Sequence, residues 1–131
     1  MKKTIQLFRR DRGQSLVEFA LVLPLFILIT LGAIEFSRLW MSMNIMTSAA
    51  REGARVAAVT APDASRVQST ASGILNAAGL TNASVSLSGP SSSTEVTVTV
   101  QADFTSTVAG FIPGVPSTLH LQQHCTMRWE G

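Results

Sequence analysis

The residues that could do chemistry in this chain are few, and the densest group lies near the carboxyl end. His120, His124 and Cys125 have side chains that bind transition metals. On a strand, however, the two histidines share one face at a separation of about 13 Å, because each residue advances about 3.3 Å. Cys125 then points to the opposite face. We therefore expect exposed histidines and a buried thiol, not a metal site.

No other residue pattern indicates catalysis. The many serines lack a positioned base and an orienting acid, and no phosphate-binding glycine loop, catalytic carboxylate pair or nucleic-acid motif is visible. The chain has 131 residues and a net charge of +2, which is room for one domain and too little charge to indicate nucleic acid as a partner. Cys125 is the single cysteine, so no disulfide forms within the chain. We expect neither an enzyme nor a cofactor.

Glu18 raises a different question, because it stands just inside the front edge of a long apolar stretch. Residues 19–34 carry no charge, and as a helix they span roughly 24 Å. Flanking apolar residues and Trp40 extend this stretch to the length of a membrane span. It lacks the polar face of a soluble helix and ends without the small-x-small motif of a removable signal. A carboxylate in hydrocarbon costs on the order of 2.5 kcal/mol or more, so Glu18 is expected to have a function.

Positive residues gather before the apolar stretch, and this sets the expected orientation. The cluster contains Lys2, Lys3, Arg9, Arg10 and Arg12. Because positive residues stay on the cytoplasmic side, we expect a cytoplasmic amino terminus and an exported remainder.

Helical spacing continues beyond the apolar stretch to about residue 60. Small residues recur four apart in two rows, which lets another backbone approach closely. The rows are Ala49, Gly53, Ala57 and Ala50, Ala54, Ala58. Their partner is either the chain's own globular part or a neighbouring subunit, and both remain open. On the same helix, Glu52 is expected to pair with Arg55.

The second half of the sequence predicts a small head. Asp63 is expected to cap a short amphipathic helix over residues 66–78, which Gly79 ends. Alternating apolar residues predict strands at 83–88, 94–104 and 118–129. The fold class is therefore α+β, with a long amino-terminal helix followed by a head of one short helix and a three-stranded antiparallel sheet.

The front of the chain resembles the processing site of type IV pilin-like proteins. There, a short basic leader ends in glycine, the fifth residue after the cut is a glutamate, and a long apolar helix follows. The matching residues here are Gly13, Gln14, Ser15, Leu16, Val17, Glu18 and Phe19. The Glu-Phe pair at residues 18 and 19 resembles the pair found in the Flp or tight-adherence (Tad) branch of these proteins. The sequences AAREGAR at 49–55 and TMRWE at 126–130 resemble the TadE-like minor pseudopilins of that system.

This resemblance implies a leader over residues 1–13, a helix over 14–60 and a head over 61–131. It implies that a prepilin peptidase of the bacterial inner membrane cuts between Gly13 and Gln14. Other pilin and pseudopilin subunits, the inner-membrane assembly platform and membrane lipid are the further implied partners. The resemblance and the spacing together give two residue sets. The processing set is Gly13, Gln14, Glu18 and Phe19, and the assembly set is Glu18, Ala49, Ala50, Gly53, Ala54 and Ala57.

Cleavage would give Glu18 a partner. The new α-amino group of Gln14 is largely cationic at neutral pH, so Glu18 of one subunit can pair with the amine of its neighbour and set the register between helices. Gln14 and Glu18 are also one helical turn apart, so a pair within one chain remains open. N-methylation of Gln14, the related TadF type and a tip, shaft or base position also stay open. The alternative classes are a protein with an uncut membrane anchor and a type II secretion pseudopilin.

Overall fold

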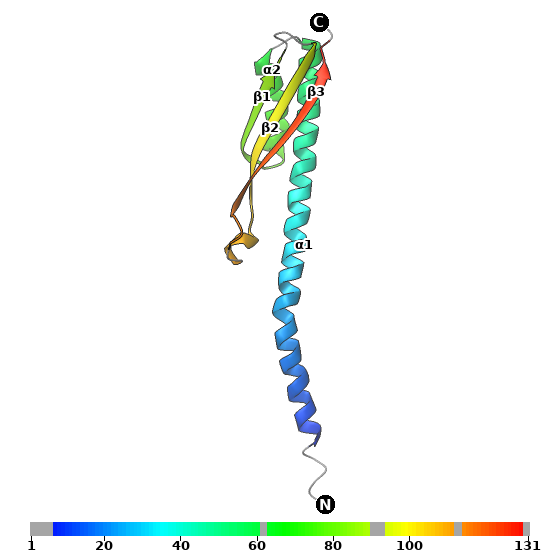
Figure 1. Cartoon of the computed structure of the whole chain (residues 1–131), viewed down its shortest axis with the longest axis vertical. Helices are drawn as coiled ribbons and strands as arrows, with labels where there is room; N and C mark the ends of the chain where they lie inside the picture. Colours follow the sequence, from blue (N-terminus) through cyan, green and yellow to red (C-terminus); the bar gives the residue numbers. More distant parts are fainter. Residues whose placement is uncertain (1–6, 61–62, 90–93, 112–113, 130–131) are drawn as a thin grey trace, which may run out of the picture. The chain divides into compact units, whose positions relative to one another are not determined.

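A computed structural model describes residues 7–60, 63–89, 94–111 and 114–129. Lys2, Lys3 and Glu130 of the sequence motifs lie outside these ranges. Figure 1 shows the elements in chain order: α1 (Leu7–Thr60), α2 (Ala64–Ala77), β1 (Thr81–Ser88), β2 (Glu95–Thr105), the 3-10 helix η1 (Val108–Phe111) and β3 (Thr118–Arg128). The predicted α+β class is confirmed.

The chain divides into two compact units, Met1–Glu35 and Phe36–Gly131, and α1 contributes to both. In the first unit, all residues from 13 to 34 are exposed. The second unit holds the head and residues 36–60 of α1. The head therefore includes part of the segment that the sequence assigns to the long helix.

The sheet has the order β1-β2-β3, and both pairs are antiparallel. On the central strand β2, alternate apolar residues are buried, as the period-two pattern predicts. These residues are Val96, Val98, Val100, Ala102 and Phe104. The opposite face is polar, and there the hydroxyls of Thr97 and Thr126 lie 2.8 Å apart. The sheet thus has one face for the core and one for solvent.

Local signals fix both ends of α2. The Asp63 carboxylate accepts a hydrogen bond from the Ser65 backbone N–H (3.2 Å), and a second from the Ser65 hydroxyl (2.6 Å). At the other end, the backbone N–H of Leu80 donates to the carbonyl of Leu75 (3.1 Å), around Gly79 at a φ of 72°. This is the glycine-terminated Schellman motif. The predicted cap and stop residues are both confirmed.

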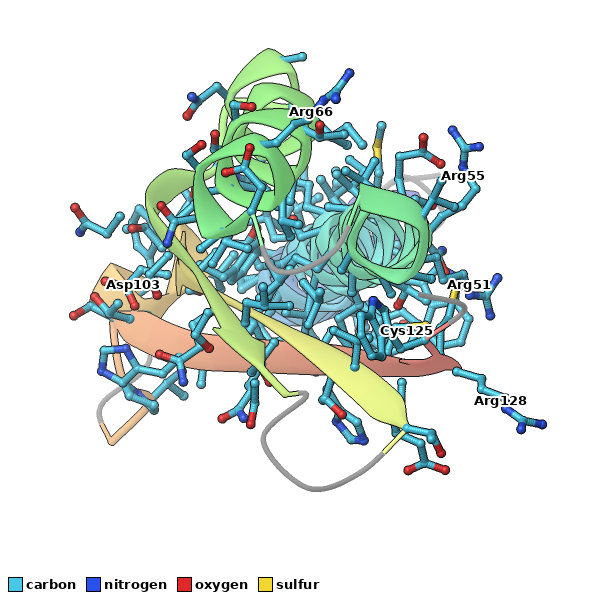
Figure 2. All side chains as sticks on the ribbon, turned by 90° about the horizontal axis from the view of Figure 1, so that it is seen from above. Arg51, Arg55, Arg66, Asp103, Cys125 and Arg128 are labelled. Carbon is cyan, nitrogen blue, oxygen red and sulfur yellow. The ribbon has the colours of Figure 1, made fainter. Side chains whose placement is uncertain are left out.

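The core lies between the helices and the apolar face of the sheet. In Figure 2, α2 and the carboxyl half of α1 lie on the same side of the sheet. Val67, Ala71 and Leu75 of α2 are fully buried. A Cβ atom built on Gly53 of α1 would lie 3.2 Å from Val98 Cγ1 and 3.5 Å from Ala71 Cβ. Among the described glycines of the helices, Gly53 alone has such close neighbours. At Gly53, α1 therefore packs tightly against both α2 and β2.

Candidate processing and assembly segment

The predicted processing residues lie together on the amino-terminal part of α1. Gly13, Gln14, Glu18 and Phe19 are all exposed. No atom lies within 4 Å of the position where a Cβ would stand on Gly13. Because α1 is helical through this region, Gln14 and Glu18 occupy one side of the helix, one turn apart. The structure therefore brings these two residues together, as predicted.

Glu18 stands at the start of a segment with the properties of a membrane anchor. Within α1, Gly13–Val59 contains a stretch long and apolar enough to cross a membrane, by length and composition. Large apolar side chains are exposed along this stretch, among them Leu21, Phe26 and Ile29. Among the described residues, none bonds the Glu18 carboxylate. The structure thus gives Glu18 no bonded partner within the described part of the chain.

The small-residue rows at the carboxyl half of α1 face the chain's own core. Ala49, Ala50, Gly53, Ala54 and Ala57 are all buried. They pack in one cluster with apolar residues of α2 and β2. Of the two partners that the sequence left open, the structure shows the chain's own globular part. A neighbouring subunit cannot reach these residues while the head is folded.

Glu52 and Arg55 form the predicted ion pair on the exposed side of this helix. Arg55 Nη2 lies 2.6 Å from Glu52 Oε1, and Arg55 Nε donates to Oε2 at 3.0 Å. The hydrogen bonds from Arg55 hold the pKa of Glu52 below its usual range. Figure 2 shows Arg55 pointing away from the core. The pair is a surface feature and contributes little stability.

The histidines and the cysteine take the predicted faces of β3. His120 and His124 are exposed and lie opposite Asp103 and Thr99 of β2, whereas Cys125 is half-buried and packs against the core (Figure 2). No three His, Cys, Asp or Glu side chains of the described ranges gather as a metal site would require.

An exposed Asp–His pair at one end of the sheet was not predicted. His120 Nδ1 lies 2.6 Å from Asp103 Oδ1, and Asn82 Nδ2 donates to Asp103 Oδ2 at 3.2 Å. The hydrogen bond with His120, followed by that from Asn82, lowers the pKa of Asp103. Alternation assigns Asp103 and His120 to the polar face, but only the strand register places them opposite one another.

Arg38 makes a second set of contacts that the sequence did not predict. Its Nη1 donates to Thr107 Oγ1 at 2.9 Å, and its guanidinium lies 5.4 Å from the centroid of the Phe104 ring. This is a cation–π geometry. Arg38 and Phe104 also line a cavity of about 360 Å³ with Met41, Ile45 and Gly79. Arg38 thus links the start of the head's helix to the carboxyl end of β2.

Comparison with known families bears on the same segment. Residues 13–55 match the model of the family described as TadE-like protein. The match begins at the glycine of the predicted cleavage site and ends at the last residue of the AAREGAR sequence. It confirms the resemblance inferred from these motifs. No curated protein and no solved structure gave a significant match to the chain.

Proposed function

We propose that this protein is a minor pilin-like subunit of a Tad pilus system, with a structural role in pilus assembly. The observation that carries the proposal is the division of α1. Its exposed apolar half starts at a pilin-like processing motif, and its other half forms the core of a small head. The TadE-like match covers both the motif and the AAREGAR sequence.

The proposed precursor carries residues 1–13 as a leader, which a prepilin peptidase removes after Gly13. The exposed apolar residues of α1 favour anchoring in the inner membrane, since they would otherwise face water. The basic residues before them favour a cytoplasmic amino terminus and an exported head. Other pilin and pseudopilin subunits and the assembly platform are the proposed partners.

The proposed role of Glu18 is to pair with the amino group that cleavage creates. Its carboxylate is exposed on a helix that otherwise presents apolar side chains there. A neighbouring subunit's amine would neutralise it in the membrane and fix the axial offset between two helices. The amine of the same chain, one turn away, is the competing partner.

Processing is tested by the intact mass of the membrane-extracted protein, made with and without a prepilin peptidase. We expect the chain to begin at Gln14 only when the peptidase is present. Gly13→Leu should block the cut, because it adds a side chain where the glycine has none. Gly32→Leu is the matched control and should be cut normally. Full-length chain as the sole species in peptidase-competent cells would contradict the proposal and leave an uncut anchor.

Assembly is tested with Glu18→Gln, which keeps the size of the side chain and removes its charge. We expect cleavage to be largely retained and the amount of surface pili to fall. Glu18→Lys should reduce pili further, because it places two cations together. Glu52→Gln, which removes a carboxylate of the head, is the control and should leave pili unchanged. Normal pili in both Glu18 variants would disprove the pairing role.

A further inference from the structure

The described residues of the connection between β2 and β3, 106–111 and 114–117, include two exposed apolar residues, Phe111 and Val115, which are called the tip below. Between Asp103 and His120 the sequence contains no Asp, Glu, Lys or Arg. Within η1, Ala109 is buried and its backbone N–H lies 3.3 Å from the Ser106 hydroxyl, which accepts it. Phe111 at the end of η1 is 78% exposed, and Val115 is 44% exposed. Two apolar side chains thus face outward from an uncharged connection.

The base of this connection is held in place by polar contacts. The backbone N–H of Ser106 donates to the carbonyl of Ser117 at 2.9 Å, which closes the base. Arg38 of α1 binds Thr107 and lies over the Phe104 ring. The tip is therefore fixed beside the first residues of α1 that belong to the head. Figure 1 shows η1 at the end of the β2–β3 hairpin away from the carboxyl end of β3.

The first residues of α1 that belong to the head directly follow the apolar stretch in the sequence. Arg38 is four residues after Ile34, the last residue of the uncharged run, and four residues span at most about 14 Å. Phe36 and Trp40, on either side of Arg38, stack with ring centroids 6.3 Å apart. Aromatic residues at the end of an apolar span are typical of the membrane–water interface. On the membrane anchoring proposed above, Arg38 and the connection that it contacts therefore follow the end of the anchor within a few residues.

We propose that this tip, with Phe111 as its main contact, inserts into the interfacial layer of the outer leaflet of the inner membrane. The partner is the lipid bilayer itself. Lipid fits because the connection is uncharged, exposes apolar side chains and contacts Arg38, four residues after the end of the apolar stretch. A contact with lipid would hold the head against the membrane until the subunit leaves the bilayer during pilus assembly. The inference rests on the membrane anchoring proposed above.

The test uses the full chain in phosphatidylcholine–phosphatidylglycerol vesicles. Cys125→Ala removes the native thiol, and one cysteine is then placed at Gly32, Gly73 or Gly110 for a polarity-sensitive fluorophore. A Cβ at each of these glycines meets no atom within 4 Å. Gly110 precedes Phe111 and reports on the tip. Quencher groups carried on the lipids report contact with the bilayer.

The other two positions are controls. Gly32 lies in the apolar stretch and reports insertion of the anchor. Gly73 reports on water around α2, because nearby Ala71 contacts α1 at Gly53, about 22 Å beyond Arg38 along the helix. We expect lipid quenching at Gly32, none at Gly73, and blue-shifted, lipid-quenched emission at Gly110. Adding Phe111→Asp should abolish the shift and the quenching at Gly110 alone.

Each other result counts against the inference in a distinguishable way. Quenching at Gly32 with a water-like Gly110 would overturn the tip contact and leave the anchor intact. A blue shift at Gly110 without lipid quenching would show a second copy of the chain on the tip in place of lipid. A water-like Gly32 would overturn the anchor and the tip contact with it.

Discussion

The two halves of α1 carry apolar residues of opposite size and exposure. From Phe19 to Ile34 the side chains are mostly large and all are exposed. From Ala49 to Ala57 they are mostly small, and those facing the core are buried. Small residues suit a partner that is itself a folded backbone, since the sheet and α2 can then come close. Large residues suit a fluid partner that adapts to their shape.

The contrast shows that apolar character alone does not reveal what covers a helix. Gly53 would crowd Val98 with one added carbon, whereas a Cβ on Gly32 would meet nothing. Side-chain size therefore separates the half of the helix that packs on protein from the half proposed to face lipid. The contrast can be tested by making the same substitution in both halves.

The largest expected effect comes from removing a buried leucine of the head. Leu75 of α2 is fully buried in the core, so Leu75→Ala should lower the free energy of unfolding by about 2–5 kcal/mol. Leu25→Ala, in the exposed half of α1, is the control and should leave the head's stability unchanged. Urea unfolding of the full chain in detergent micelles, followed by Trp fluorescence, measures both. Equal losses would mean that the exposed half also supports the head.

A smaller effect is expected from filling the tightest contact of α1. Gly53→Leu forces its side chain against Val98 and Ala71, and overpacking of this kind costs about 1–3 kcal/mol. Gly32→Leu should have no such effect on the head. The same unfolding measurement compares the two variants. A stable Gly53→Leu head would show that α1 can move away from the sheet without loss.

The smallest effect is a dependence on pH that belongs to the head. Hydrogen bonds from Ser65 hold the pKa of Asp63 below its usual range, as His120 does for Asp103 and Arg55 for Glu52. A lowered folded pKa stabilises the fold above the unfolded value, and this stability is lost as the pH falls through the folded pKa. The head should therefore become less stable as the pH falls below about 5 and on through the lowered folded pKa values of these carboxylates.

Asp63→Asn isolates one contribution, because it keeps the cap acceptor and removes the charge. The variant should show a flatter decrease of unfolding free energy with falling pH than the unaltered chain. Both effects should be small, since these carboxylates are exposed to solvent. Identical pH profiles for the two proteins would show that the Asp63 carboxylate acts only through its shape.

Most of the fold was predictable because its signals are local. The alternation of β2, the cap at Asp63 and the stop at Gly79 each depend on neighbours in sequence, and each was confirmed. What escaped prediction depends on distant residues. The Arg38–Thr107 hydrogen bond joins positions 69 residues apart, and no spacing rule links them. The short helix η1 was missed because its residues show no periodicity long enough to detect.

The candidate site was predictable only as a motif. Its residue types and order identify Gly13, Gln14, Glu18 and Phe19, and the helix places Gln14 and Glu18 one turn apart. Small-residue spacing predicted a close contact but not its partner, because a sheet and a neighbouring helix both accept such a surface. The fold shows which partner covers the small residues: Val98 of β2 and residues of α2 lie next to Gly53.

Because α1 starts at Leu7, the proposed cleavage site lies within a helix, and this bears on the rate at which the proposed peptidase can cut. Gly13 lies inside the helix, where the peptide groups are held in hydrogen bonds, so the bond after it becomes accessible only when that turn unwinds. A glycine weakens a helix interior by about 1 kcal/mol relative to alanine, which raises the unwound fraction about fivefold. On the proposed pathway, Gly13 therefore influences the rate of maturation as well as the position of the cut. Gly13→Ala, which adds little bulk, should slow processing without moving the cut.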